Sequence, residues 1–328
     1  MSRTWEIVAG VVFLVLCLLG GIGLARWTTP KPVIGVVRFD TLIDTRSTAA
    51  LIDVIERAAQ DERVAGVVLE IASPGGLASA SENIFYSLLR LREGKPVVAV
   101  VDGVAASGGY YMAAAANRIY APSSAFLGNV GTRGPRPQDP MISPHEISSG
   151  PYKLSGGDRF DRLNQLEVVA SAFVGNVVHQ RQFAENALTI DAETVAEGRI
   201  YLGSEAAALG LIDGEGGRTD AILTAAELAG VPAYDVIDLA ADYDVSIAAP
   251  AAPAPSIEES VARLAAEAPP DAIFLLDSRI PLPGVGTSSA LEEHLLRLRA
   301  VDPGSLKPAA PPPALPGIAA TPTAEAAP

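Results

Sequence analysis

Residues 97–121, VVAVVDGVAASGGYYMAAAANRIYA, decide the fold class of this chain. The β-branched run 97–101 predicts a buried strand, and the small residues from 107 to 116 predict a helix after a Gly-containing turn. Residues 118–121 predict a second strand. Strands that alternate with helices in this way indicate an α/β fold with parallel strand pairing.

The same alternation continues on both sides of this stretch. Residues 64–71 form a mainly apolar run that is rich in β-branched residues, which is typical of a strand that helices cover on both faces. Further apolar runs and helical periods extend the pattern from residue 33 to residue 240. The expected elements are strands at 33–37 and 64–71 and helices at 49–59, 77–92 and 161–186.

The composition excludes several classes of function. The chain has 328 residues and a formal net charge of -14, and such a surface repels nucleic-acid phosphates, so we expect no nucleic-acid partner. The single cysteine, Cys17, excludes an intramolecular disulfide and a cysteine-based metal cluster. His145, His179 and His294 are scattered and form no HExxH motif, so neither a catalytic metal nor another cofactor is expected.

The N-terminus carries an apolar segment of membrane-spanning length. Residues 7–25 contain no charged side chain and would form a helix of roughly 28 Å, which is close to the thickness of the bilayer core. Trp5 and Trp27 flank it as interfacial anchors do. A buried core helix and a cleaved signal peptide are the alternatives. We expect an uncleaved single-pass anchor in the cell membrane, with the catalytic domain outside the cytoplasm.

The C-terminal part differs in composition from the rest of the chain. Residues 303–328 are rich in proline and alanine, and such a sequence cannot bury a core, so a disordered tail is predicted. Helices are expected at 256–267 and 288–298. The predicted organisation is a membrane anchor at 1–32, an α/β domain at 33–240, an accessory segment at 241–302 and the tail.

Ser107 is a candidate nucleophile. It precedes Gly108 and Gly109 at the predicted start of a helix, where a hydroxyl most often serves as an N-cap. The same place suits a nucleophile, because the helix dipole and the free N–H groups there stabilise negative charge. Ala105, two residues before the serine, excludes the GxSxG elbow of α/β-hydrolases.

Two further segments carry candidate residues. Ser73-Pro74-Gly75-Gly76 follows the strand at 64–71, and its glycines either make a simple strand-to-helix turn or present backbone N–H groups to a ligand. Lys153 ends the polar loop 148–153 in a chain whose basic residues are almost all arginine. It is either an exposed loop residue or a general base, since lysine can lose its proton when its pKa is lowered.

These segments together resemble the signal peptide peptidase SppA family of Ser–Lys proteases. The resemblance rests on SPGG at 73–76, on DGVAASGGYYMAAAANRIYA at 102–121 and on SSGPYK at 148–153. Downstream, GRIYLG at 198–203 and AAALGLID at 206–213 are similar to the closing segment of the family. Each motif is short, and their order along the chain makes the resemblance specific.

The resemblance implies a ClpP/crotonase-like fold, with stacked ββα units around a parallel sheet. It also implies that Ser107 is the nucleophile, that Lys153 is the base, and that the N–H groups of Gly76 and Gly108 form the oxyanion hole. A lysine has a pKa of about 10.4 in water and needs burial to act as a base near neutral pH. We therefore expect Lys153 to be buried in the working enzyme, and the family implies a homo-oligomer.

Two features depart from the family pattern. The family carries Gly-Ser-x-Gly after the nucleophile helix, and its serine helps to hold the lysine, whereas this chain has Asn129 at the matching position. The side-chain oxygen of Asn129 can accept a hydrogen bond from an amine, so we expect it to support Lys153. The segment between this motif and Lys153 is shorter than usual and rich in proline, which alters the expected substrate groove.

The expected function is that of a membrane-anchored serine endopeptidase. It would cleave signal-peptide remnants or other membrane-associated peptides through an acyl-enzyme. One further hypothesis is a membrane-bound Ser–Lys protease of the NfeD type, which acts on stomatin-like partners. Another is a non-catalytic, crotonase-like scaffold, which the presence of Asn129 keeps open.

Overall fold

The computed structural model describes residues 3–28, 31–134, 149–150, 152–153, 159–247, 256–268 and 272–280. Within these residues, eight strands form one sheet: β1 (Val33–Phe39), β2 (Val64–Ser73), β4 (Val97–Ala106), β5 (Arg118–Ala121), β6 (Phe126–Gly128), β7 (Ile200–Leu202), β8 (Gly214–Glu215) and β9 (Asp235–Asp238). The strand order is β7-β6-β4-β2-β1-β9, and β5 pairs with both β4 and β8.

Most of the strand pairs in this sheet are parallel. β1 pairs in this way with β2 and with β9, and β4 does so with β2, β5 and β6. β6 and β7 are antiparallel. The mixed α/β fold with parallel pairing that the sequence predicts is therefore confirmed.

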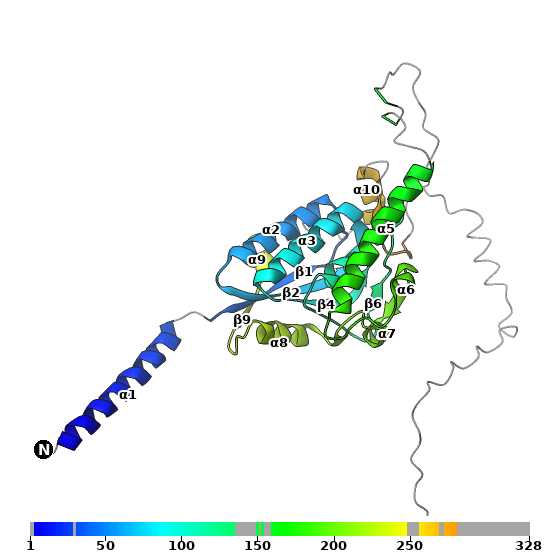
Figure 1. The fold of residues 1–328 in the computed structure, drawn as a ribbon. Helices are drawn as coiled ribbons and strands as arrows, with labels where there is room; N and C mark the ends of the chain where they lie inside the picture. Colours follow the sequence, from blue (N-terminus) through cyan, green and yellow to red (C-terminus); the bar gives the residue numbers. More distant parts are fainter. Residues whose placement is uncertain are drawn as a thin grey trace, which may run out of the picture. The chain divides into compact units, whose positions relative to one another are not determined.

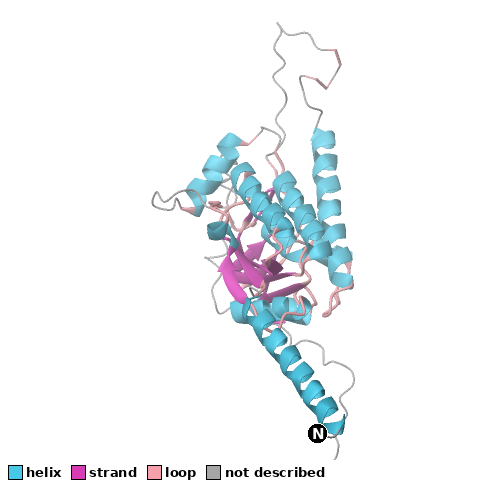
Figure 2. Ribbon diagram, turned by 90° about the vertical axis from the view of Figure 1, so that its left-hand side faces the viewer, coloured by secondary structure: helices cyan, strands magenta, loops and turns pink. Residues whose placement is uncertain are grey.

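Helices cover both faces of the sheet (Figure 1). One face carries α2 (Thr45–Gln60), α3 (Ala78–Gly94), α4 (Gly108–Ala114) and α5 (Arg159–Gln182), and the other carries α8 (Arg218–Leu228). Figure 2 shows the strands, in magenta, enclosed between these layers. Along β2, Leu69 packs into the first layer and Val68 packs with α8, which explains why apolar residues on both faces dominate this strand.

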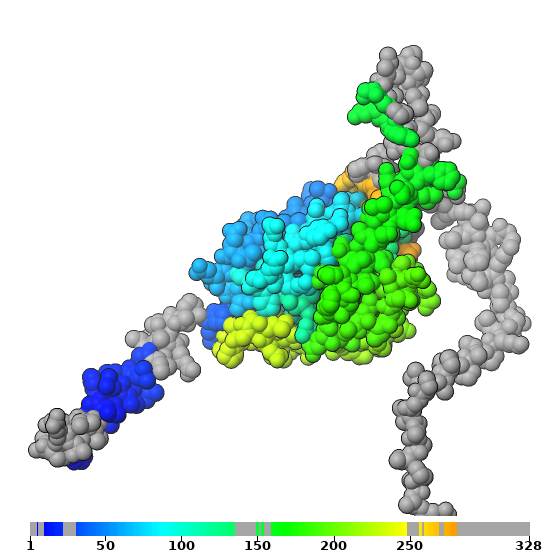
Figure 3. Space-filling view, in the orientation of Figure 1, coloured from blue at the N-terminus to red at the C-terminus, as the bar shows by residue number. Residues whose placement is uncertain are grey.

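An N-cap and a side-chain hydrogen bond hold helices of the layer formed by α2, α3, α4 and α5. Asp44 caps α2, because its side chain accepts a hydrogen bond from the Ser47 N–H (2.7 Å), and the Ser47 hydroxyl oxygen accepts one from the Asp44 N–H. α3 and α5 form neighbouring parts of one face of the molecule (Figure 3), and the Arg92 guanidinium donates to the Gln180 side chain (2.7 Å) between them. These helices form a fixed support for α4, which lies between them and the sheet.

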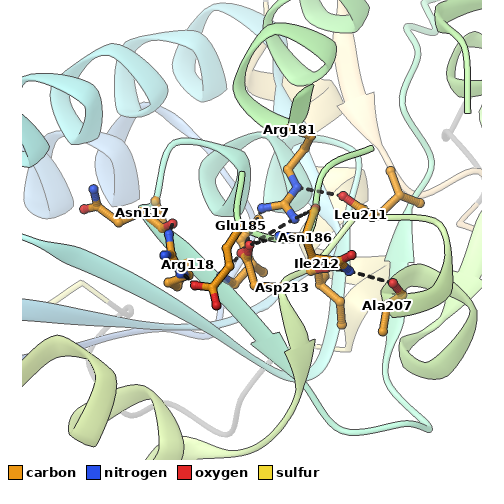
Figure 4. Close-up of polar contacts among 12 residues, drawn as sticks. Asn117, Arg118, Arg181, Glu185, Asn186, Ala207, Leu211, Ile212 and Asp213 are labelled. Carbon is orange, nitrogen blue, oxygen red and sulfur yellow. Dashed lines mark hydrogen bonds and ion pairs between the residues drawn. The ribbon is translucent and has the colours of Figure 1, made fainter. Parts of the chain in front are cut away.

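A buried ion pair ties α5 to the turn that follows α7 (Gly203–Ala208). Arg181 and Asp213 have side chains that are 2% and 3% exposed, and two guanidinium N–H groups donate to the carboxylate. Figure 4 shows the Arg181 guanidinium beside the Asp213 carboxylate. The guanidinium also donates to the Gly210 carbonyl, while the carboxylate accepts from the Ile119 N–H. The smaller helices α6 (Ala192–Ala196) and α9 (Leu239–Asp242) complete this part of the chain.

The apolar N-terminal segment forms a helix, α1 (Arg3–Thr28). Side chains such as Val11, Phe13 and Leu14 are exposed on it. None of the helices in the described residues combines the length and the hydropathy that a membrane crossing requires. The membrane anchor at 7–25 is therefore not confirmed and stays a prediction.

Part of the accessory segment packs against the α/β domain. The helix that the sequence predicts at 256–267 is α10 (Ile257–Glu267), and a strand, β10 (Phe274–Leu276), follows it. β10 pairs with β3 (Gly75–Leu77) in a separate two-stranded sheet. A small apolar cluster joins the two elements to the domain: Leu42, Val261, Leu264, Phe274 and Leu276. The helix predicted at 288–298 and the tail at 303–328 lie outside the described residues.

Candidate active site

Ser107 lies between the end of β4 and the first residue of α4. Its backbone has φ 53° and ψ -116°, a left-handed conformation that is uncommon for any residue except glycine. The side chain is 1% exposed, and its Oγ has no hydrogen-bond partner in the described part of the chain. A buried hydroxyl without a partner costs free energy, and both features are typical of a functional residue.

The two glycines after Ser107 are required by close packing. An added Cβ on Gly109 would collide with the carbonyl oxygen of Ser73, at the end of β2. An added Cβ on Gly108 would collide with the Ser81 Oγ of α3 and would lie 3.2 Å from the carbonyl oxygen of Leu275. The absence of side chains therefore lets the first turn of α4 approach β2 and α3 closely.

The tyrosines of the same motif hold α4 in place. The Tyr110 hydroxyl is buried and donates to the Leu211 carbonyl (2.6 Å), and the Tyr111 ring stacks on Phe85 at 4.4 Å between ring centroids. Burial raises the pKa of Tyr111 to about 12, and it also raises the pKa of Tyr110, so both hydroxyls stay protonated near neutral pH. Their role is to anchor the helix that carries Ser107.

The glycine pair at 75–76 lies beside the pair at 108–109. Gly75 has φ 98°, and a Cβ added there would lie 2.9 Å from the backbone nitrogen of Gly108. The Gly75 carbonyl and the Leu77 N–H both bond to Ile43, so the Gly76 N–H faces the opposite edge of β3. The structure thus places the segment that contains Gly76 against Gly108, the residue that follows Ser107.

Asn129 is held next to the same strand ends. The Ser107 N–H donates to the Gly128 carbonyl (2.8 Å), and Asn129 follows in a left-handed conformation with φ 55°. Its side-chain oxygen accepts from the Ser278 N–H (2.9 Å), and its amide donates to the Gly198 carbonyl (2.7 Å). In this structure the amide of Asn129 therefore binds the accessory segment, and the predicted support of Lys153 by Asn129 stays a prediction.

Lys153 is exposed in this chain. Its backbone N–H donates to the Gly150 carbonyl (3.2 Å), and within the described residues its amine makes no hydrogen bond or ion pair. Among the residues that the structure describes, none buries Lys153 as a lysine base requires. The Ser107–Lys153 dyad therefore stays a prediction.

Residues 272–280 also contribute to the site and were not among the predicted site residues. The signal was the apolar run Ala272–Leu276, which lies between proline-rich stretches and has the length of a strand. Leu275 is 1% exposed and Asp277 is 2% exposed, so this short run is buried as deeply as the strands of the main sheet.

The glycine contacts give a first testable prediction. Gly108→Ala should lower the free energy of unfolding by about 1–3 kcal/mol through overpacking, and Ser81→Ala should recover part of the loss by removing the colliding Oγ. Gly109→Ala should lose a similar amount without rescue, because its Cβ meets a backbone carbonyl at Ser73. Urea unfolding of the single and double variants measures both effects. Equal recovery of both alanine variants by Ser81→Ala would contradict this packing.

Comparison with known proteins identifies the family of this chain. Residues 90–138, which include Ser107, match the family model described as Peptidase family S49. A candidate protease of Synechocystis is 32% identical over 189 residues, which cover 53% of this chain and 67% of the relative. This chain belongs to peptidase family S49, the SppA family. The resemblance of its sequence motifs to that family is thereby confirmed.

The chain covers different fractions of the lengths of its relatives. The chloroplastic serine protease SPPA of Arabidopsis thaliana is 34% identical over 195 residues, which cover 56% of this chain and 28% of that protein. This S49 family member therefore spans about a quarter of the length of that relative. Among solved structures, a mutant of a membrane-bound stomatin-specific protease has a TM-score of 0.42 and 19% identity, over 60% of this chain and 86% of that one.

Proposed function

We propose that this S49 family member is a serine endopeptidase with Ser107 as its nucleophile. The observation that carries the proposal is the buried Ser107 Oγ, which has no hydrogen-bond partner in the described residues and lies in a left-handed turn. Two glycine segments, 75–76 and 108–109, pack against each other beside it, and none of these residues covers its backbone N–H group with a side chain of its own. A hydroxyl next to such N–H donors suits acyl transfer, because those donors stabilise the negative charge that forms on the attacked carbonyl oxygen.

The reaction proceeds through an acyl-enzyme. Lys153, when neutral, takes the proton of the Ser107 hydroxyl, while Oγ forms a bond to the carbonyl carbon of the substrate. The N–H groups of Gly76 and Gly108 bind the oxyanion. The protonated lysine then transfers its proton to the leaving amine as the C–N bond breaks, and water hydrolyses the ester to release Ser107.

Lys153 reaches this role in the assembled enzyme. Burial lowers the pKa of a lysine, and the exposed position of Lys153 in the single chain means that another segment or a second copy has to cover it. We infer a homo-oligomer in which this cover forms, within a ClpP/crotonase-like fold. Asn129 accepts a hydrogen bond from the lysine amine once Ser278 leaves it.

The substrates we propose are membrane-associated peptides, such as signal-peptide remnants. The apolar segment 7–25 of α1 supports this proposal, because exposed side chains such as Val11, Phe13 and Leu14 would hold the chain at a bilayer with the catalytic domain outside the cytoplasm. Sedimentation with membranes after alkaline washing tests that part separately from catalysis.

A serine-directed fluorophosphonate probe tests the catalytic proposal. We expect covalent labelling of the native chain at Ser107, mapped by mass spectrometry, and no labelling after heat denaturation. Lys153→Arg should reduce the labelling rate by at least about 10²-fold, since arginine keeps the charge but cannot act as a base.

Lys31→Ala is the matched control, because Lys31 is exposed and pairs with Asp235 at the surface. It should label like the wild type. Labelling at another serine, or full labelling of Lys153→Arg, contradicts the proposed dyad.

A further inference from the structure

An extended segment of the chain itself lies along the glycine strand of the site. β10 pairs antiparallel with β3, with Phe274 opposite Leu77, Leu275 opposite Gly76 and Leu276 opposite Gly75. Two hydrogen bonds continue this ladder beyond both ends. The Ala78 N–H donates to the Ile273 carbonyl (2.9 Å), and the Asp277 N–H donates to the Pro74 carbonyl (2.7 Å).

The other edge of this segment is also paired. The Arg133 N–H donates to the Phe274 carbonyl (3.1 Å), and the Phe274 N–H donates to the Arg133 carbonyl (2.9 Å). The Arg133 guanidinium donates to the carbonyls of Asp277 (3.1 Å) and Ile280 (2.8 Å). An extended peptide with backbone partners on both edges is bound in the way that proteins recognise peptides by strand addition.

The register places one carbonyl at the predicted oxyanion hole. In an antiparallel ladder, hydrogen-bonded pairs alternate with non-bonded pairs, and the bonded pairs on both sides make Leu275 and Gly76 a bonded pair. The Gly76 N–H therefore faces the Leu275 carbonyl oxygen. An added Cβ on Gly108 would lie 3.2 Å from the same oxygen, so this carbonyl lies against both glycines next to Ser107.

The side chains of the segment divide between two environments. Leu275 packs into the main core of the domain and is 1% exposed, whereas Phe274 and Leu276 point to the cluster with α10. The core of the domain thus receives one aliphatic side chain, on the residue whose carbonyl faces the glycines. An acidic side chain at that place would lose its hydration among apolar neighbours.

We propose that residues 273–277 occupy the peptide groove of this chain as a substrate would, with Leu275 at the residue whose carbonyl Ser107 attacks. This inference rests on the proposed function and names the substrate: an extended peptide with an aliphatic residue before the cleaved bond. While the segment is bound, it excludes other peptides and covers Ser107. Its departure also frees Asn129, because Ser278 leaves with it.

A free peptide with this sequence is then a substrate of the opened site. Oγ of Ser107 forms an ester with the carbonyl carbon of the leucine that matches Leu275. The C–N bond to the next leucine breaks, and its amine takes a proton from the base. One water molecule hydrolyses the ester and restores the serine.

The test uses the full chain with Leu275→Asp or Leu276→Asp, two changes in the segment itself that place a carboxylate among buried apolar side chains and leave the rest of the groove unchanged. We expect both variants to hydrolyse a reporter peptide with a kcat/KM at least about tenfold above wild type, because the open fraction rises. The reporter is Ala-Ile-Phe-Leu-Leu-Asp-Ser, the sequence of residues 272–278. Mass spectrometry should place the cut between its two leucines.

Leu223→Asp is the matched control, since Leu223 on α8 is 56% exposed, and it should leave turnover unchanged. A reporter with aspartate in place of the first leucine should not be cut. Variants that label with the probe at Ser107 like wild type but gain no turnover contradict the occupied groove. If no form of the chain labels at Ser107, the proposed function fails instead, and the inference fails with it.

Discussion

Ser107→Ala should abolish peptide hydrolysis, with a loss of at least about 10³-fold in kcat, while the protein stays as stable as wild type or becomes more stable. The loss of activity follows from the proposed function, because the variant lacks the hydroxyl that would form the acyl-enzyme. The gain in stability follows from the structure of the site, because the buried Oγ has no partner in the described residues. Removing an unsatisfied buried hydroxyl recovers up to about 1–3 kcal/mol of desolvation.

The backbone at this residue sharpens the prediction. Ser107 has φ 53°, a conformation that costs free energy for any residue with a Cβ but not for glycine. Ser107→Gly should therefore be as inactive as Ser107→Ala and at least as stable in urea unfolding. A substitution that abolishes activity and raises stability is typical of a residue that serves catalysis and not folding.

Ser81→Ala is the matched comparison. Ser81 is also fully buried, but its Oγ donates to the Leu77 carbonyl (2.8 Å). Its replacement should lower the free energy of unfolding by about 1 kcal/mol, because a satisfied hydrogen bond is lost. A Ser107→Ala protein that is destabilised to the same extent, or that keeps its turnover, would show that Ser107 is a structural N-cap.

The fold was predictable from the sequence because its strands carry a strong local signal. β2 and β4 consist mainly of apolar residues, and their burial under helices on both faces requires that composition. The lengths of the strands were less predictable. The predicted strand at 97–101 continues to Ala106, since the glycine at position 103, with φ 82°, lies within a strand that bends but does not end.

The site was predictable in part. Ser107 and the two glycine segments could be found because their small residues allow the close backbone approaches that the structure contains. The pairing of β10 with β3 could not be found in the same way. It joins residues about 200 positions apart in the sequence, and a three-residue strand has no periodicity of its own. Lys153 could be singled out from its loop motif, but its exposure could not be predicted, because such a motif carries no information about burial.

Arg181→Met should lower the free energy of unfolding by about 3–5 kcal/mol, the largest stability effect expected in this chain. The substitution keeps a similar volume but leaves the Asp213 carboxylate, which is 3% exposed, without its cation. The carboxylate also accepts from the Ile119 N–H of β5, so its charge cannot move to solvent without breaking the sheet edge. Thermal unfolding should shift downward by roughly 10 °C.

Two comparisons separate the buried charge from the loss of side-chain volume. Arg118→Met removes a neighbouring ion pair whose acidic partner, Glu185, is 70% exposed, and it should cost no more than about 1 kcal/mol. Adding Asp213→Asn to Arg181→Met should recover part of the loss, because asparagine keeps an oxygen for the Ile119 N–H and carries no charge. If the double variant is no more stable than Arg181→Met, the ion pair contributes less to stability than the other contacts of the guanidinium. Those contacts are its packing and its hydrogen bonds to backbone carbonyls. Since the Tyr110 hydroxyl bonds to Leu211 in the same turn, a loosened Asp213 should also slow the labelling of Ser107 before the domain unfolds.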